Sequence, residues 1–470
     1  MTRNPAPSLL PAALALACLC LIGAAPRAAA ADAPPVPLRP GPYPLLDDAL
    51  IEHQTHLARR VQSPRRERAD PVVTGPEDKN DQPYVTVLRD PQSKRFRMWY
   101  DASGDATHSG LFALGYLESD DGIRWQRPHR LLDGPPGMRW GASVLDEGPG
   151  YPDAARRFKF GWWQDGGLRI AASPDGLRWR PLAPGVVLRH NHDINSICRD
   201  PARKRYVALV SSYTTGAKWR GKRRITLESV SDDLIHWKEP WPVLTPDDSK
   251  DAGETQFYCV GGVLARGRAL IGMLKVLRDE LPADKGGKAR GIGYTVLAWS
   301  HDGEHWQRDR EPFLDRDPRQ GAWDHAMSWA DCQLPVGDEV YIYYAGYARG
   351  HKVERFTERQ LGLVRIPRDR YVAWEAGDAE GTLRTPLLTL HGTGLSLNVD
   401  AHEGVVRAQV VDREGKPIPG FTFADGEPIR RDALDAALRW AKPLSALQGQ
   451  PVRLELTLRR ARLFGLDVQP

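Results

Sequence analysis

The sequence spells nearly the same seven residues four times, as "SDDGIRW" at 119–125, "SPDGLRW" at 173–179, "SDDLIHW" at 231–237 and "SHDGEHW" at 300–306. A repeat at a roughly constant interval is the signature of an architecture built from similar units. The Asp and Gly predict a tight turn between outer strands, because Gly readily takes a positive φ. We expect each tryptophan to pack between units. We therefore interpret this tryptophan motif as scaffold at the periphery, away from any catalytic residues.

A second feature recurs in phase with the tryptophan motif. The stretches "RDPQSKRFRMWY" (89–100), "YPDAARRFKFGWW" (151–163) and "RDPARKRYVALV" (199–210) each place a polar turn before an alternating apolar strand. Looser versions begin at residues 264 and 335. This pattern is typical of a β-hairpin. The Arg-Asp-Pro at Arg199 resembles a catalytic triplet of fructan-cleaving hydrolases. Because the same triplet at Arg89 occupies the same hairpin position, we predict that both are turns.

Each unit therefore contains about four strands, and five such units predict an all-β protein with a five-bladed β-propeller. We place the propeller at residues 40–390. "PRDRYVAW", which ends at Trp374, is a degenerate fifth copy of the motif, and "GTLRTPLLTL" (381–390) is a candidate for the last blade strand. Alternating residues around Gly and Asp turns predict a small β-sandwich at 391–470. A short helical piece is expected within it at 430–441.

The first 31 residues have the pattern of a secretory signal peptide. Arg3 precedes an apolar run from Leu9 to about Ala25, and small residues of the Ala-x-Ala type follow. We therefore expect the protein to be secreted or periplasmic. The formal net charge is only +5, so nothing indicates a nucleic-acid surface. The remaining cysteines, Cys198, Cys259 and Cys332, are widely spaced in apolar runs, which predicts buried free thiols.

In a propeller, the start of each inner strand faces the central channel. Acidic residues stand at four of these five starts: Asp81, Asp193, Glu254 and Asp324. His192 and His325 stand beside two of them. Strands that read as buried rarely open on charges without a partner or a purpose. Either these acids catalyse a reaction, or they form ion pairs or hold a structural cation.

The five units, the stretch "SDDLIHWKEPWPVL" and the acids on the inner strands resemble the five-bladed propeller glycoside hydrolases of families 32 and 43. The chain looks most like a group of secreted bacterial family-32-like proteins. The resemblance implies three catalytic acids: Asp81 as nucleophile or base, Asp193 as helper and Glu254 as proton donor. The sequence departs from family 32 in reading "NDQP" for its Asn-Asp-Pro-Asn, and in placing Thr and Gln after Glu254.

The chemistry of these residues fits a sugar substrate. Glycoside cleavage needs one protonated carboxyl at the leaving oxygen and one carboxylate across the ring. Glu254 opens an apolar strand after a polar loop, and desolvation there would raise the pKa of a carboxyl. Sugar binding also needs hydroxyl ligands and aromatic platforms. We expect these roles to be filled by His192, Gln256, Tyr258, Trp323, Asp324 and His325, with Trp140 and Trp329 as further platforms.

We therefore predict a secreted glycoside hydrolase that acts on an oligosaccharide or polysaccharide, such as a furanoside. We expect a carbohydrate as its partner, without nucleic acid, membrane, cofactor or metal. The first alternative is a non-catalytic carbohydrate-binding propeller, which would lack an opposed carboxyl pair. The second is a glycoside phosphorylase, which needs a basic phosphate site, with Lys275 and Arg278 as candidates.

Overall fold

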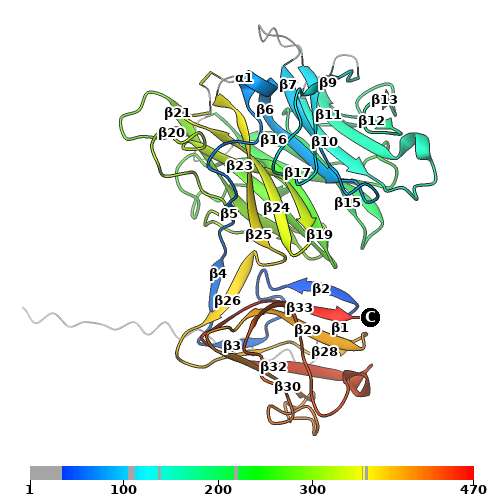
Figure 1. Ribbon diagram of the computed structural model, residues 1–470, viewed down its shortest axis with the longest axis vertical. Helices are drawn as coiled ribbons and strands as arrows, with labels where there is room; N and C mark the ends of the chain where they lie inside the picture. Colours follow the sequence, from blue (N-terminus) through cyan, green and yellow to red (C-terminus); the bar gives the residue numbers. More distant parts are fainter. Residues whose placement is uncertain are drawn as a thin grey trace, which may run out of the picture.

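The computed structural model describes residues 34–103, 112–135, 138, 140–215, 221–351, 353–354 and 358–470. The expected signal peptide at residues 1–31 lies outside the described residues. The described chain is built almost entirely of strands, and its one α-helix is the single turn α1 (Gly75–Asp78). The prediction of an all-β protein is confirmed. Figure 1 shows a larger body, formed by residues 65–367, above a smaller body that holds the remaining strands.

Three sheets of the larger body take their strands in chain order, and each strand pairs antiparallel with the next, except that β14 pairs with β12. The first sheet comprises β6 (Asn80–Arg89), β7 (Phe96–Ser103), β8 (Phe112–Ser119) and β9 (Arg130–Leu132). The second comprises β10 (Trp140–Asp146), β11 (Phe158–Gln164), β12 (Gly167–Ser173), β13 (Arg180–Pro181) and β14 (Leu188–Arg189). The third comprises β15 (Asn195–Asp200), β16 (Arg205–Thr215), β17 (Lys222–Ser231) and β18 (Trp241–Leu244). This order is the one that the sequence repeat predicts.

A fourth sheet of eight strands contains two further runs of the same order. The first run comprises β19 (Gln256–Arg266), β20 (Ala269–Pro282), β21 (Arg290–Ser300) and β22 (Gln307–Arg308). The second run comprises β23 (Met327–Val336), β24 (Glu339–Tyr347), β25 (Gln360–Pro367) and β5 (Arg65–Arg66). A single parallel pair, Gly293 with Met327, joins the runs. β5 is the first strand of this body in the sequence and β25 is the last. Their pairing in the second run therefore brings together the two ends of the chain segment that forms the larger body.

The two Arg-Asp-Pro triplets form hairpin turns, as expected. Asp90 accepts a hydrogen bond of 2.7 Å from the backbone N–H of Ser93. Asp200 accepts one of 3.1 Å from Nη1 of Arg203. Each hairpin contains a lysine with a left-handed backbone, φ 62° at Lys94 and 55° at Lys204. These hydrogen bonds of both aspartates lie within the turn region, although Asp90 also pairs with Arg157 at 3.6 Å, so the shared triplet reflects local turn geometry.

The tryptophan motif forms the same hydrogen-bonded turn in all four copies. In the second copy, Oδ1 of Asp175 accepts the backbone N–H groups of Leu177 and Arg178 at 2.9 and 3.1 Å. Oγ of Ser173 accepts the N–H of Gly176 at 2.9 Å. Equivalent bonds recur in the other copies. The tryptophan directly follows this turn and precedes a short outer strand, so it packs at the entry to that strand.

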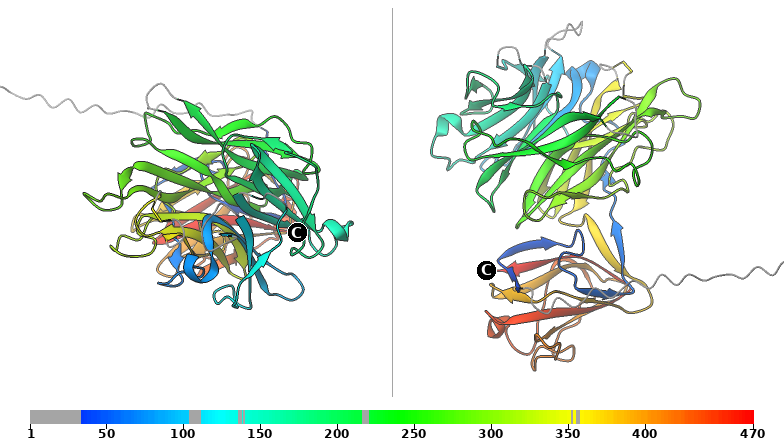
Figure 2. Two further views of the ribbon diagram at one scale, coloured as in Figure 1. Left: turned by 90° about the horizontal axis from the view of Figure 1, so that it is seen from above. Right: turned by 180° about the vertical axis from the view of Figure 1, so that it is seen from behind.

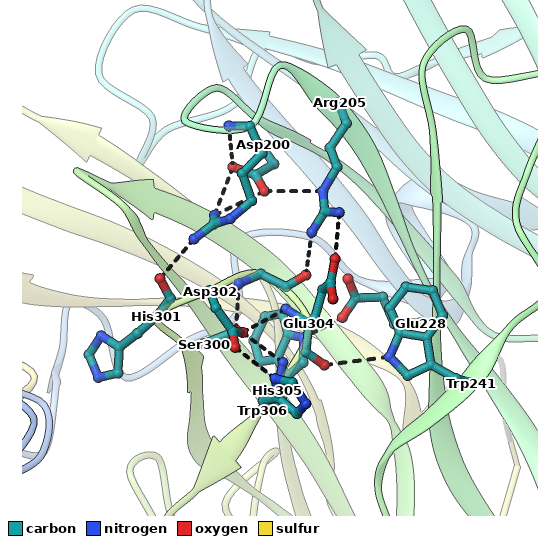
Figure 3. A network of polar contacts seen from close by, with 12 residues as sticks. Asp200, Arg205, Glu228, Trp241, Ser300, His301, Asp302, Glu304, His305 and Trp306 are labelled. Carbon is teal, nitrogen blue, oxygen red and sulfur yellow. Dashed lines mark hydrogen bonds and ion pairs between the residues drawn. The ribbon is translucent and has the colours of Figure 1, made fainter.

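The fourth copy of the motif shows how neighbouring sheets are held together (Figure 3). Nη2 of Arg205, on β16, donates to the carbonyl of Gly303 at 2.7 Å. Nε1 of Trp306 donates to Oε2 of Glu228, on β17, at 2.6 Å. Three of the four motif tryptophans are at most 8% exposed. The motif therefore packs between adjacent sheets, as the sequence analysis expects.

The smaller body consists of two sheets around a second apolar core. One sheet comprises β1 (Val36–Leu38), β28 (Leu388–Leu390), β32 (Pro451–Arg459), β27 (Gly381–Arg384), β3 (His53–Thr55) and β30 (Val405–Val411). The other comprises β31 (Asp432–Ala437), β29 (Gly394–Asp400), β33 (Ala461–Gln469), β26 (Val372–Ala376), β4 (Ala58–Val61) and β2 (Gly41–Pro44). Figures 1 and 2 show that the chain passes between the bodies near β4 and β26.

This pairing differs from the sequence expectations in three places. The strands at 36–61 and 372–390 belong to the same two sheets as the strands beyond residue 391, so the sheet pairing does not follow the expected boundaries at 40 and 390. Trp374 lies in β26 beside Leu463, and is not part of a fifth motif turn. The segment 432–437 is strand β31 and not a helix, because β29 supplies hydrogen-bond partners that local propensity cannot reveal.

Candidate functional site

A cavity of about 320 Å³ lies in the larger body, and we call it the central pocket. All four sheets of that body contribute to its wall, through strands β6, β10, β11, β16, β17, β19, β23 and β24 and the loops beside them. No aspartate of the tryptophan motif is among the described lining residues. The lining residues are Gln82, Pro83, Tyr84, Trp140, Trp163, Asn191, His192, Asp193, Tyr213, Arg224, Tyr258, Trp329, Tyr347, His351 and Arg359.

Aromatic side chains form much of this wall. Trp140 and Trp163 are half-buried and stand opposite each other on the paired strands β10 and β11. Tyr258 packs on Trp329, with ring centroids 4.5 Å apart. Ligand pockets typically combine such aromatic surfaces with a few placed polar groups. The wall therefore offers flat apolar faces of the kind on which a sugar ring packs.

Asp193 lies at the pocket wall beside a histidine and an arginine. Its Oδ1 is 3.1 Å from Nε2 of His192, and its side chain is 29% exposed. Nε of Arg224 donates a hydrogen bond of 2.8 Å to the same Nε2. The His192 proton therefore belongs on Nδ1. Burial, reinforced by the Arg224 charge, lowers the pKa of His192 to about 2, so this ring is neutral at physiological pH.

A second polar chain in the wall joins Asp279, His351 and Tyr258. Nδ1 of His351 is 3.0 Å from Oδ1 of Asp279, and its Nε2 is 3.0 Å from the hydroxyl of Tyr258. With Asp279 accepting the Nδ1 proton, Nε2 accepts the hydrogen bond from Tyr258. Burial lowers the pKa of His351, which also keeps this histidine neutral. The chain fixes the orientation of Tyr258 in the pocket.

Asp81 lies behind the lining residue Gln82, whose Nε2 donates to its Oδ2 at 3.1 Å. The neighbouring Asp101 is fully buried, and the backbone N–H of Gly141 donates to it at 3.2 Å. Burial and then the charge of Asp81 raise the pKa of Asp101 well above its usual value. Burial therefore favours the protonated form of Asp101. The sequence analysis did not single out Asp101, because it stands in the middle of β7 and not at a strand start.

Glu254 is exposed and is not among the residues that line the pocket. Its backbone N–H donates to Oε1 of Glu280 at 3.1 Å. Gln256, two residues on, is buried and accepts a hydrogen bond of 2.8 Å from Nη1 of Arg224. The structure therefore brings Gln256 to the pocket through Arg224, but leaves the expected proton donor outside.

Trp323, Asp324 and His325 also lie away from the lining. Asp324 is buried in an ion pair with Arg66 at 3.0 Å and accepts a hydrogen bond of 2.8 Å from the hydroxyl of Tyr344. Nε1 of Trp323 donates to the carbonyl of Ala69. His325 is held by Asp284 and by the carbonyl of Asp317. Asp324 therefore forms an ion pair, which was the alternative to a catalytic role. Its partner Arg66 lies on β5, far from Asp324 in the sequence.

Of the residues expected from the sequence, His192, Asp193 and Tyr258 line the pocket, as do the platforms Trp140 and Trp329. Five further lining residues lie in later strands of a unit or in loops after them, where no sequence pattern marks them: Trp163, Tyr213, Arg224, His351 and Arg359. The basic residues proposed for phosphate lie elsewhere. Lys275 is buried in an ion pair with Asp331, and Arg278 pairs with Glu280.

Within the described ranges, no three His, Cys, Asp or Glu side chains gather as a metal site would require. The same ranges contain no helix that is long and apolar enough to cross a membrane. Cys198, Cys259 and Cys332 are buried and free, as the sequence predicts.

No protein-family model matches the chain, and no curated protein matches it. Solved structures do resemble it, at low identity. One, described as a glycoside hydrolase, has a TM-score of 0.47 at 14% identity and covers 65% of this chain and 92% of its own. Another comes from a study of the family-130 mannoside phosphorylases, which contain glycoside hydrolases that target β-1,2-mannosidic linkages in Candida mannan. It has a TM-score of 0.46 at 15% identity and covers 66% and 95%. An N-acetylgalactosamine deacetylase from F. plautii has a TM-score of 0.43 at 16% identity and covers 67% and 96%. Similarities this distant do not assign a reaction.

Proposed function

We propose that the protein is a carbohydrate-active enzyme that cleaves a glycosidic bond of an oligosaccharide or polysaccharide held in the central pocket. The observation that carries the proposal is the position of Asp193. It is the carboxylate among the described lining residues, and aromatic faces surround it. Carbohydrate sites combine aromatic faces with polar groups that orient hydroxyls, and glycoside cleavage is carried out by carboxyl groups.

Asp193 and Asp81 are the two carboxyl groups that we assign to the reaction. Asp193 lines the pocket, and Asp81 adjoins the lining residue Gln82, whose Nε2 donates a hydrogen bond to it. One of the pair protonates the leaving oxygen, and the other acts as base or nucleophile. Because burial raises the pKa of Asp101 and favours its protonated form, this residue opposes a second negative charge beside Asp81. Glu254 has no part in this assignment, since its side chain is exposed outside the pocket.

We further propose that the five runs of strands in the larger body are the blades of a five-bladed propeller, and that the two sheets of the smaller body form a β-sandwich. The strand order of each run and the closure of the last run by β5 support this description. The resemblance to families 32 and 43, and the secretion of the mature protein, remain parts of the same proposal.

The proposal is tested by incubating the purified protein with 4-nitrophenyl glycosides and plant or microbial polysaccharides, and by measuring released sugar. Asp193→Asn should lower turnover by roughly 10²–10⁴-fold. Asp165→Asn is the matched control, because Asp165 is a surface aspartate paired with Arg169. Binding without cleavage by the wild type would identify a carbohydrate-binding protein instead. Cleavage that requires phosphate and yields a sugar phosphate would identify a phosphorylase.

A further inference from the structure

We propose that Arg224 and Arg359 form an oxyanion subsite in the central pocket, so that its ligand carries a carboxylate or phosphate group. The source that we favour is the carboxylate of an acidic sugar, and free inorganic phosphate offers the same chemistry. The inference rests on the proposed function only in taking the ligand to be a carbohydrate. It specifies that this carbohydrate carries an anionic group, which the proposed function by itself does not require.

Arg224 enters the pocket from β17 and has no carboxylate within ion-pair distance among the described residues. Its Nε and Nη1 donate to His192 and Gln256, which are both neutral acceptors. The guanidinium also lies over the ring of Tyr258, 4.3 Å from the centroid. These contacts fix the plane of the guanidinium without neutralising its charge. Nη2 takes part in neither of these two bonds, and the hydroxyl of Tyr213 also interacts with the guanidinium.

Arg359 is more deeply buried, at 3% exposure, and it too lacks a carboxylate partner within the part of the chain that is described. Its Nη1 donates to the carbonyl of Asp81 and to Oε1 of Gln82. The guanidinium lies 5.1 Å from the ring centroid of Tyr347. Its Nε is buried and has no hydrogen-bond partner among the described residues. Nε of Arg205 is likewise unused although Arg205 is paired with carboxylates, so the feature that sets Arg359 apart is its buried charge without a carboxylate, which is costly unless something supplies a counter-charge.

Other arginines of this protein show what ordinary pairing looks like. Arg157 makes two bonds to Asp146, and Arg127 makes two to Asp78. Arginine recognises carboxylate and phosphate through such paired N–H groups. The two pocket arginines have carbonyl, amide and imidazole acceptors in place of carboxylates. Their pairing is therefore incomplete in a way that an anionic ligand group would complete.

The other charged groups at the pocket do not fill this role. His192 and His351 are neutral. Asp279 is engaged by His351, and Asp193 lies against His192. Asp81 meets Arg359 through its backbone carbonyl and not through its carboxylate. None of these acids stands within ion-pair distance of either arginine among the described residues.

The test compares the binding of D-galacturonate and D-glucuronate with that of D-galactose and D-glucose, and of inorganic phosphate, by calorimetry or saturation-transfer NMR. We expect an anion to bind at least about tenfold tighter than the neutral sugars, since hydrogen bonds to charged groups are worth that much or more. Raising the salt concentration should weaken the binding of the anions but not the binding of the neutral sugars. Preference for the uronates identifies an acidic sugar, and binding of phosphate without uronates identifies phosphate.

Arg359→Gln and Arg224→Gln should each abolish the preference of the protein for the anions over the neutral sugars. Arg178→Gln removes the same charge from an exposed arginine and should have no effect. If Arg359→Gln unfolds, Arg224→Gln decides, because Arg224 is only half-buried. Equal binding of acidic and neutral sugars by the wild type would overturn the subsite but leave the proposed cleavage intact. If the wild type preferred anions but cleaved no glycoside, the proposed cleavage would be overturned and the subsite would stand.

Discussion

Glu228 accepts a hydrogen bond of 2.6 Å from Nε1 of Trp306, so a fully buried carboxyl on one sheet receives the tryptophan of the next repeat (Figure 3). Its other oxygen, Oε1, is buried without a hydrogen-bond partner in the described structure. Burial raises the pKa of Glu228 from 4.5 to about 8. The contact between these sheets is therefore made by a carboxyl that is protonated at neutral pH.

This contact predicts a pH dependence of stability. Between pH 4.5 and about 8 the folded protein holds a proton on Glu228 that the unfolded chain releases. The contribution of Glu228 to the free energy of unfolding therefore falls as pH rises through that window, by about 1.4 kcal/mol for each pH unit. Glu228→Gln keeps an oxygen acceptor for Trp306 but cannot titrate. The difference in melting temperature between this variant and the wild type should therefore shift in favour of the variant as the pH rises from 5 to 8. Parallel curves for the two proteins would contradict the prediction.

Glu254→Gln should leave turnover and melting temperature close to those of the wild type. The side chain is exposed and lies outside the central pocket, so its removal takes no group from the substrate. Steady-state kinetics on the best substrate from the glycoside panel measure this, with Asp193→Asn as the variant that must lose activity. A large loss of turnover in a folded Glu254→Gln variant would restore the role that the family resemblance implies.

Asp324→Asn should destabilise the protein by about 3 kcal/mol without altering KM. Removing one partner of a buried ion pair leaves the other charge uncompensated, and here that charge is on Arg66 of β5. Urea denaturation gives the change in stability. Asp309→Asn, which breaks the pair of Arg59 with Asp309, provides a second ion pair for comparison. If Asp324→Asn remained as stable as the wild type but lost substrate binding, Asp324 would belong to the site after all.

Trp163→Ala should raise KM by about fivefold to tenfold with little change in kcat. Trp163 presents a half-buried indole at the pocket wall, and an aromatic contact with a ligand is worth about 1 kcal/mol beyond the area that it buries. Trp440→Ala is the control, since Trp440 is half-buried in the smaller body. An equal effect of both substitutions would mean that the loss reflects general stability and not binding.

The features that the sequence by itself determined are those whose hydrogen bonds are local. In each tryptophan motif, Ser and Asp bond to backbone groups two and three residues away, so any chain segment with these residues makes the same turn. The Arg-Asp-Pro hairpins are local in the same way. Alternation of apolar residues then predicts the strands, and the repeat interval predicts their order. This is why the all-β architecture and the peripheral place of the motif could be predicted.

Tertiary structure alone decided which residues share the pocket. Asp193, Glu254 and Asp324 look alike in sequence, since each precedes an apolar strand. Yet one lines the pocket, one is exposed, and one is paired with an arginine more than 250 residues away. Arg224 and Arg359 meet in one wall only because separate sheets converge there. A partner distant in sequence determines whether a buried charge is neutralised or left for a ligand, and no local pattern records that partner.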